Sequence, residues 1–180
     1  MNTFALPDHL EGKDIKNCRT LLGLTQAQFA ELSGVTKKTI ERWEGSKAPI
    51  TGPIVTLVKL LTENAQYAER LRIPPRRSML RLWYMCGKEP CTLIDVDPVK
   101  RRVEIKNYTS FPQHRAFGIV TEPTYEEYEE FLESRCFPRS RDKMKIHLEA
   151  LGLPFYDPYM IVEKTEGRMA EDDYWIRIER

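Results

Sequence analysis

The sequence predicts an α+β protein: an N-terminal all-helical bundle of four or five helices, followed by a small mixed domain with antiparallel strands and three helices. Apolar residues recur at helical spacing through the first third of the chain, whereas after residue 79 their period shifts towards two. Between these parts, residues 65–81 hold five arginines and two adjacent prolines that cannot continue a helix. We therefore expect a helical domain at 1–65, a basic linker at 66–79 and a mixed domain at 80–180.

Capping signals divide the helical domain into separate helices. The second, third and fourth predicted helices each open at a residue that satisfies free backbone N–H groups or at a glycine–proline pair. These openings are the Thr25 and Gln28 capping box, Thr36, and Gly52 with Pro53. The apolar residues that we expect to face the core are Ile15, Cys18, Leu22, Phe29, Ala30, Ile40, Trp43, Ile54, Leu57, Val58 and Leu61.

The mixed domain should begin with three short antiparallel strands and end with a fourth strand. The strand segments are 80–86, 91–97, 101–106 and 172–179. Between the third and fourth strands we expect three helices, because three capping signals precede apolar faces of helical spacing. Those signals are Thr124 with Glu127, Ser140 or Asp142, and Asp157 with Pro158.

Composition excludes several classes of protein. The chain is 41% hydrophobic and 31% charged with a formal net charge of +1, so any affinity for DNA must come from local arrangement. The four cysteines lack the paired two-residue spacing of zinc sites, and we expect free thiols and no metal or other cofactor. Neither a signal peptide nor a stretch long enough for a membrane span is visible. We therefore expect a cytoplasmic protein.

Residues 19–45, RTLLGLTQAQFAELSGVTKKTIERWEG, resemble the lambda-repressor/Cro-like helix-turn-helix family, also called XRE-type. Five short motifs coincide in the family's register: Leu-Gly-Leu-Thr-Gln, Phe-Ala, Gly-Val-Thr, Thr-Ile and Trp-Glu-Gly. The resemblance implies a bundle over residues 12–64 that binds double-stranded DNA, with a bacterial or phage origin. It also implies that Arg19 and Glu44 form a structural ion pair between the first and third helices.

The residues themselves support DNA binding. If Ile40 and Trp43 face the core, then Lys37, Lys38 and Arg42 face outward at a helix start that suits the major groove. Each lysine alone is equally well explained as a solvated surface charge, and the outward Glu41 either reads a cytosine amino group or, as we favour, faces solvent. The candidate DNA-binding residues are Gln26, Thr36, Lys37, Lys38, Thr39, Arg42 and Lys47.

Two charge patterns bear on the interpretation as a DNA-binding domain: the first weakens it and the second could extend the contact surface. Residues 1–64 hold eight Lys/Arg against seven Asp/Glu, so the helical domain as a whole is almost neutral. The arginines of the linker are most simply solvated, with auxiliary phosphate contacts as the alternative.

The mixed domain has a second resemblance. Residues 135–152 and 160–178 are similar to a segment ahead of the catalytic core of some bacterial HipA-like kinases, and 80–97 match that module's opening strands. The resemblance implies a kinase toxin as protein partner of residues 80–180. No glycine-rich phosphate loop, HRD-like or DFG-like run is present, so we expect no enzyme and no catalytic residues.

These observations predict a sequence-specific transcriptional regulator, an autorepressor of antitoxin type whose C-terminal module binds a partner protein. Because the chain has no internal repeat, a second recognition helix must come from a second copy, and we expect a homodimer on a near-palindromic operator. The alternatives are a prophage or mobile-element repressor without a toxin, and a dual-role inhibitor whose C-terminal module binds a host enzyme.

Overall fold

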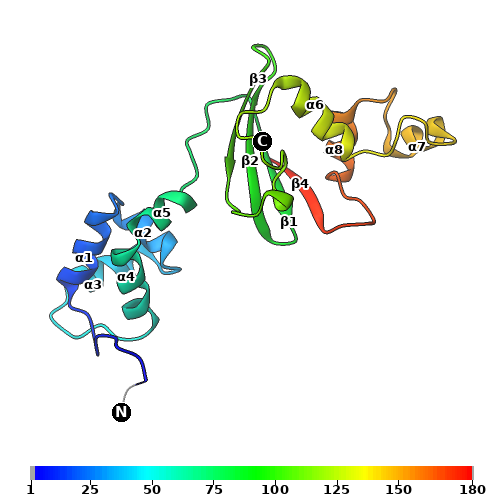
Figure 1. Cartoon of the computed structure of the whole chain (residues 1–180). Coiled ribbons are helices and arrows are strands. Elements are labelled where there is room, and N and C mark those ends of the chain that lie inside the picture. Colours follow the sequence, from blue (N-terminus) through cyan, green and yellow to red (C-terminus); the bar gives the residue numbers. More distant parts are fainter. Residues whose placement is uncertain (1–2, 180) are drawn as a thin grey trace. The chain divides into compact units, whose positions relative to one another are not determined.

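The computed structural model describes residues 3–179 (Figure 1). Within this range the chain forms eight α-helices and a four-stranded antiparallel sheet, and it divides into two compact units between Ile73 and Pro74. The α+β class predicted from the sequence is confirmed. No helix in the described range is both long and apolar enough to cross a membrane.

The N-terminal unit is a bundle of five helices. They are α1 (Gly12–Leu21), α2 (Gln26–Leu32), α3 (Lys37–Glu44), α4 (Pro53–Glu63) and α5 (Ala65–Leu71). The predicted capping box of Thr25 and Gln28 opens α2, and the Thr36 hydroxyl accepts the backbone N–H of Thr39 at the start of α3. The expected apolar faces meet in one core, in which Ile15, Phe29 and Ile40 have no exposed surface.

Helix α5 occupies part of the segment that was expected to be a linker. Its residues carry no helix breaker, and Ala68 is 9% exposed because it packs against the core of the N-terminal unit. The helix ends at Leu71, before the two prolines. The stretch without helix or strand is therefore residues 72–79, which is shorter than expected.

The C-terminal unit is built on strands β1 (Leu80–Cys86), β2 (Glu89–Asp97), β3 (Arg102–Asn107) and β4 (Tyr174–Glu179). Their order across the sheet is β3-β2-β1-β4, and every neighbouring pair is antiparallel. Helices α6 (Tyr125–Ser134), α7 (Met144–Leu151) and α8 (Pro158–Thr165) and a 3₁₀ turn (Pro112–His114) lie between β3 and β4 in sequence. The main core of this unit combines Leu82 and Ile94 from the sheet with Phe131 of α6 and Ile161 of α8.

The opposite face of the sheet is covered as well. Trp83, Met85 and Leu93 form a small cluster there and are each at most 5% exposed. Beside it, Arg81 donates two hydrogen bonds, of 2.7 and 2.6 Å, to the Asp95 carboxylate. Alternate side chains of β1 therefore lie in two buried clusters, one on each face of the sheet. Neither face of this strand is turned to solvent.

The starts of the helices in this unit follow the sequence signals in two cases out of three. The capping box of Thr124 and Glu127 opens α6, and the Asp157 carboxylate caps α8, as predicted. The prediction that Ser140 or Asp142 opens the middle helix is wrong. Helix α7 begins after Lys143, which has a left-handed backbone (φ 55°) and offers no side-chain cap. The Asp142 carboxylate instead accepts the backbone N–H of Lys143, the next residue.

Candidate nucleic-acid interface

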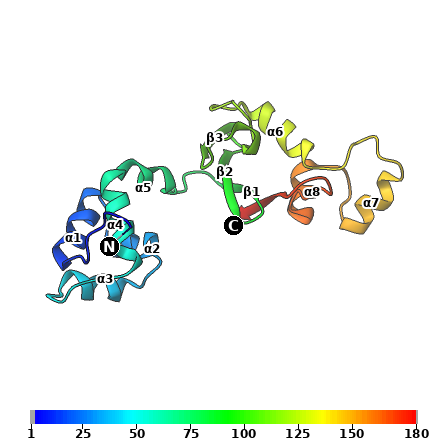
Figure 2. The same cartoon turned by 60° about the horizontal axis from the view of Figure 1, so that its bottom comes forward.

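Helix α3 lies at the border of the N-terminal unit, where one of its faces is anchored and the other is open (Figure 2). Ile40 is fully buried, and Trp43 packs against the same core. Lys38 and Arg42 are exposed on the other side of the helix. The anchored face holds α3 in place, so that a row of polar side chains is presented to solvent at a fixed position.

A tight turn joins α2 to α3. Gly34 has a left-handed backbone (φ 66°), a conformation that glycine adopts without a steric penalty. The next residue, Val35, donates its backbone N–H to the Ala30 carbonyl in the last part of α2. This closure ends α2 as a helix C-cap does and turns the chain into the Thr36 cap of α3. The turn therefore sets the angle between the two helices.

An ion pair joins the last turn of α1 to the end of α3. Arg19 donates from Nε to Oε1 of Glu44 at 2.6 Å and from Nη2 to Oε2 at 3.2 Å, and its Nη1 reaches the Leu24 carbonyl. The two side chains are 17% and 10% exposed. Burial opposes the charge of Glu44, but hydrogen bonds from Arg19 and Gln26 outweigh it and lower the pKa of this carboxyl. The bond to Glu44 in turn raises the pKa of Arg19.

Gln26, at the first position of α2, takes part in the same network. Its Nε2 donates to Oε2 of Glu44 at 2.8 Å, and the residue is half-buried. From the sequence, this amide was expected to be available for a phosphate. The structure shows that one of its donors is already used, which leaves the second N–H and the carbonyl for a ligand. Glu44 thus fixes the orientation of the Gln26 side chain beside α3.

The remaining candidate residues are of two kinds. The hydroxyls of Thr36 and Thr39 lie 2.9 Å apart, and Thr36 also caps α3, so both are engaged within the protein. The charged candidates Lys37, Lys38, Arg42 and Lys47 are exposed. Of these, Lys37 pairs with Glu41 at 3.2 Å, whereas the other three form no ion pair within residues 3–179.

Sequence reasoning missed one residue that positions α3. Gly12, the first residue of α1, faces the end of α3 so closely that a Cβ there would lie 2.5 Å from the Trp43 carbonyl oxygen. Only glycine fits at this contact. A glycine at the start of a helix can be required for many reasons. The reason at Gly12, its close contact with the end of α3, can be recognised only from the packing of α1 against α3.

The arrangement of a capped, anchored helix after a tight turn is that of a helix-turn-helix, and a comparison with protein-family models matches residues 15–57 to the helix-turn-helix family. Residues 15–57 are an XRE-type helix-turn-helix. The chain therefore carries the DNA-binding domain of this class of regulators. No curated protein and no solved structure matches the chain significantly.

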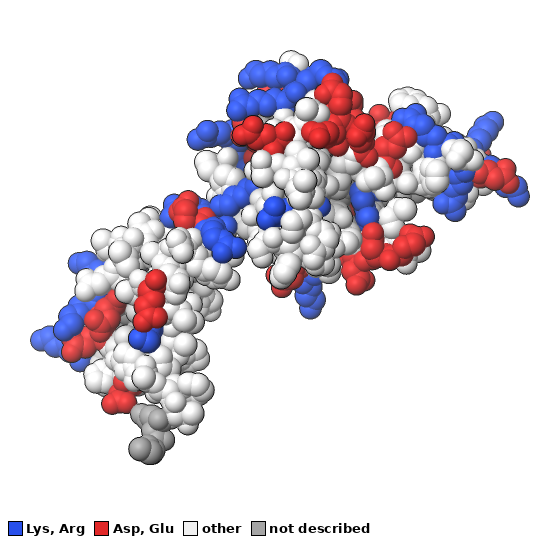
Figure 3. Space-filling view, viewed as in Figure 1, with Lys and Arg blue, Asp and Glu red and all other residues white. Residues whose placement is uncertain are grey.

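The surface of the helix-turn-helix is mixed in charge. Figure 3 shows lysine and arginine side chains next to aspartate and glutamate side chains around α1 and α3. The Lys37–Glu41 pair is one case of this mixing. On the face that Figure 3 shows, the helix-turn-helix therefore presents no broad patch of basic side chains.

Proposed function

We propose that the protein is a sequence-specific repressor that inserts the N-terminal half of α3 into the major groove of its operator and acts on its own operon in the cytoplasm. The observation that carries the proposal is the position of Lys37, Lys38 and Arg42 on the open side of a helix that Ile40 anchors. Basic side chains at the start of a recognition helix reach base edges, and basic groups beside them contact phosphates. In the same proposal, Lys47, which follows α3, and the second N–H of Gln26 contact phosphates.

Selection from random duplexes tests this proposal. The full chain should enrich one sequence, and fluorescence anisotropy should then give tighter binding to it than to an unrelated duplex of equal length. The logarithm of the affinity should fall with the logarithm of the salt concentration by about 0.9 for each phosphate contact. Equal affinity for both duplexes at all salt concentrations would refute sequence-specific binding.

We further propose a homodimer on a near-palindromic operator, with half-sites about 34 Å apart, one turn of the duplex. Two features support it. The N-terminal unit exposes Leu21 and Leu60 at 56% and 53%, and the sheet has β3 and β4 as its edges. Sedimentation of the free protein and of its operator complex tests the assembly. A one-to-one complex at saturating protein, on a site without inverted symmetry, would contradict it.

The C-terminal unit is our candidate for binding a partner protein, and a HipA-like kinase toxin is the first to test. The support is the resemblance of residues 135–152 and 160–178 to the module that precedes the catalytic core of such kinases. Co-expression with the neighbouring reading frame should yield a stable complex if that frame encodes such a kinase. A neighbouring frame unrelated to kinases, or a kinase that does not copurify, would favour a repressor without a toxin. Capture of a host enzyme instead would favour the inhibitor role.

A further inference from the structure

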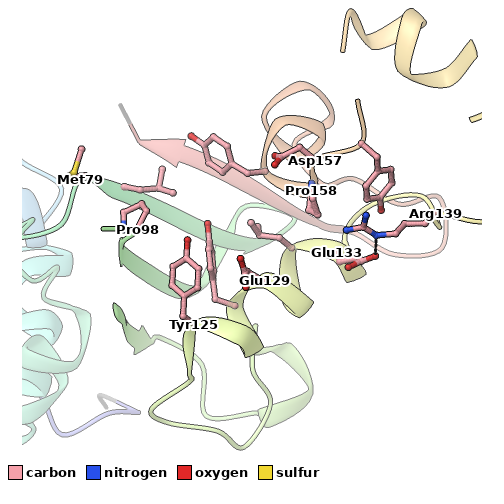
Figure 4. A pocket seen from close by; sticks show the side chains of 13 residues that line it. Met79, Pro98, Tyr125, Glu129, Glu133, Arg139, Asp157 and Pro158 are labelled. Atoms are coloured by element: carbon pink, nitrogen blue, oxygen red, sulfur yellow. Dashed lines mark hydrogen bonds and ion pairs between the residues drawn. The ribbon is translucent and has the colours of Figure 1, made fainter. Parts of the chain in front are cut away.

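A pocket of about 810 Å³ opens on the C-terminal unit beside α6 and the start of α8 (Figure 4). Four tyrosines contribute to its wall: Tyr125, Tyr128, Tyr156 and Tyr159. Leucine, proline and methionine side chains complete the apolar part of the lining. The volume lies within the range of about 300–1,000 Å³ that small-molecule sites occupy.

The charged groups of this pocket are mostly acidic. Glu129, Glu133 and Asp157 line it together with one cation, Arg139. Arg139 is paired with Glu133 at 2.6 Å, so its charge is already compensated. Figure 3 shows that acidic side chains also gather over α6 outside the pocket. Glu129 is paired with Arg101 at 3.4 Å, so Asp157 is the lining carboxylate without an ion pair among the described residues, and a cation would be attracted to it.

Asp157 has one oxygen available for a ligand. Its Oδ1 accepts the backbone N–H of Met160 and so caps α8. No hydrogen bond to Oδ2 occurs within the part of the chain that the structure describes. The carboxylate is thus fixed in orientation by the helix that it caps, and its second oxygen can accept from a ligand without loss of the cap.

The hydroxyl of Tyr128 is a second polar group that a ligand in this pocket can reach. The residue is 3% exposed, lines the pocket, and has no hydrogen-bond partner for its hydroxyl among the described residues. Burial above all raises the pKa of this phenol, and Asp157 and Glu129 are among the neighbouring charges that add to the effect. The hydroxyl is not among the fully buried polar atoms without a partner in the described residues, so water in the pocket can hydrogen-bond to it, and a ligand can replace that water. A donor in the pocket would satisfy it.

The tyrosines of this pocket already contact cations. The Arg101 guanidinium lies 4.3 Å from the ring centre of Tyr125, and that of Arg139 lies 4.5 Å from the ring centre of Tyr156. Both distances are typical of cation–π contacts. The aromatic wall therefore has the chemistry of a surface that attracts positively charged groups.

We propose that this pocket binds a small organic cation, an ammonium or amidinium group on an apolar body. The cationic head donates to Oδ2 of Asp157 and to the hydroxyl of Tyr128, and the apolar body packs against the tyrosine rings. The C-terminal unit is then a ligand-binding module attached to the helix-turn-helix. This binding is independent of the proposed repressor function and is measured without DNA.

Titration of the full chain with matched probes tests the proposal. Benzamidine and phenethylamine carry the cation, and benzamide and phenethyl alcohol are their neutral counterparts of similar shape. Calorimetry and amide chemical shifts should detect one site for each cation, with shifts concentrated in α6 and around Asp157. The neutral probes should bind more weakly by about ten-fold or more, because they lack a charge-assisted hydrogen bond. Equal binding of charged and neutral probes, or no shifts near the pocket, would overturn the proposal.

Two conservative variants separate the role in binding from the role in folding. Asp157→Asn removes the charge but keeps a good helix cap, and it should weaken benzamidine binding about ten-fold. Tyr128→Phe keeps the ring and should weaken it about three- to ten-fold. Glu130→Gln removes a carboxylate from the same helix outside the pocket and should change affinity by less than about two-fold, as expected of a distant screened charge. If both pocket variants bind benzamidine as the wild type does, the pocket is not a small-cation site.

Discussion

The two units of this protein each join an arginine to a carboxylate, but at different depths. Arg19 and Glu44 connect two helices, and their side chains are 17% and 10% exposed beside the open face of α3. Arg81 and Asp95 are opposite each other on neighbouring strands, and their side chains are 4% and 9% exposed. Because a charge loses more hydration the deeper it lies, removing one partner should be costlier in the sheet than in the helical bundle.

A third ion pair is much more exposed to solvent than these two. Lys37 and Glu41 on α3 are 59% and 46% exposed and 3.2 Å apart. Solvent-exposed pairs contribute about 0–1 kcal/mol to stability. The exposed cations of α3 that are proposed to bind DNA, Lys37, Lys38 and Arg42, should therefore contribute little to the stability of the fold and can change without unfolding the bundle.

The largest effect should follow from Asp95→Ala. This substitution leaves the Arg81 guanidinium buried without its partner and should lower the free energy of unfolding of the C-terminal unit by about 3–5 kcal/mol. Urea denaturation followed by hydrogen exchange and mass spectrometry resolves the two units. The matched control is Glu104→Ala on β3, whose pair with Arg102 is exposed and which should cost less than about 1 kcal/mol. Equal losses in the two variants would remove the distinction by depth.

The second prediction concerns operator affinity. Replacing Lys37 and Lys38 together with alanine should weaken operator binding by about 1–3 kcal/mol for each base that the protein no longer reaches. Circular dichroism and the melting temperature should stay unchanged because both side chains are exposed. Lys59→Ala on α4 is the control, since this residue pairs with Glu63 away from α3. Unaltered affinity in an anisotropy titration would show that the start of α3 does not read DNA.

A smaller loss is expected from Glu44→Ala. Arg19 and Gln26 would both lose an acceptor, but they lie near the surface, so the N-terminal unit should lose about 1–3 kcal/mol of unfolding free energy. Glu41→Ala on the same helix should cost less than about 0.5 kcal/mol. Thermal denaturation of both variants measures the difference. A Glu44 variant that is as stable as wild type but prefers another operator would instead make this residue part of the DNA-reading surface.

The smallest effect is a pH dependence. The pKa of Glu44 is lowered on folding, so its stabilisation is fully present above the ordinary value of 4.5 and is lost as pH falls through the folded value. Between pH 7 and pH 3 the wild-type N-terminal unit should therefore lose more stability than Glu44→Gln, which cannot ionise. Denaturation at a series of pH values compares the two proteins. Parallel curves over this range would contradict the role of the carboxylate charge.

The sequence is informative about the starts of helices in both units, for a local reason. Helix caps act between residues three apart, so Thr25, Thr36 and Thr124 could be read directly as the starts of helices. The same reasoning failed at α7, where Asp142 bonds to its neighbour and a left-handed Lys143 precedes the helix. Side-chain bonds to adjacent backbone compete with capping, and the pattern of residues does not reveal which one forms.

The outward register of Lys37, Lys38 and Arg42 also followed from the sequence, because the spacing of Ile40 and Trp43 defines the buried face of a single helix. The contacts between elements did not. That Gly12 meets the end of α3, that Gln26 bonds to Glu44, and that the pocket of Tyr128 exists all depend on how separate elements pack. Periodicity and capping are properties of neighbouring residues along the chain, whereas the depth of Arg81 and the shape of a pocket arise only when distant segments exclude water together.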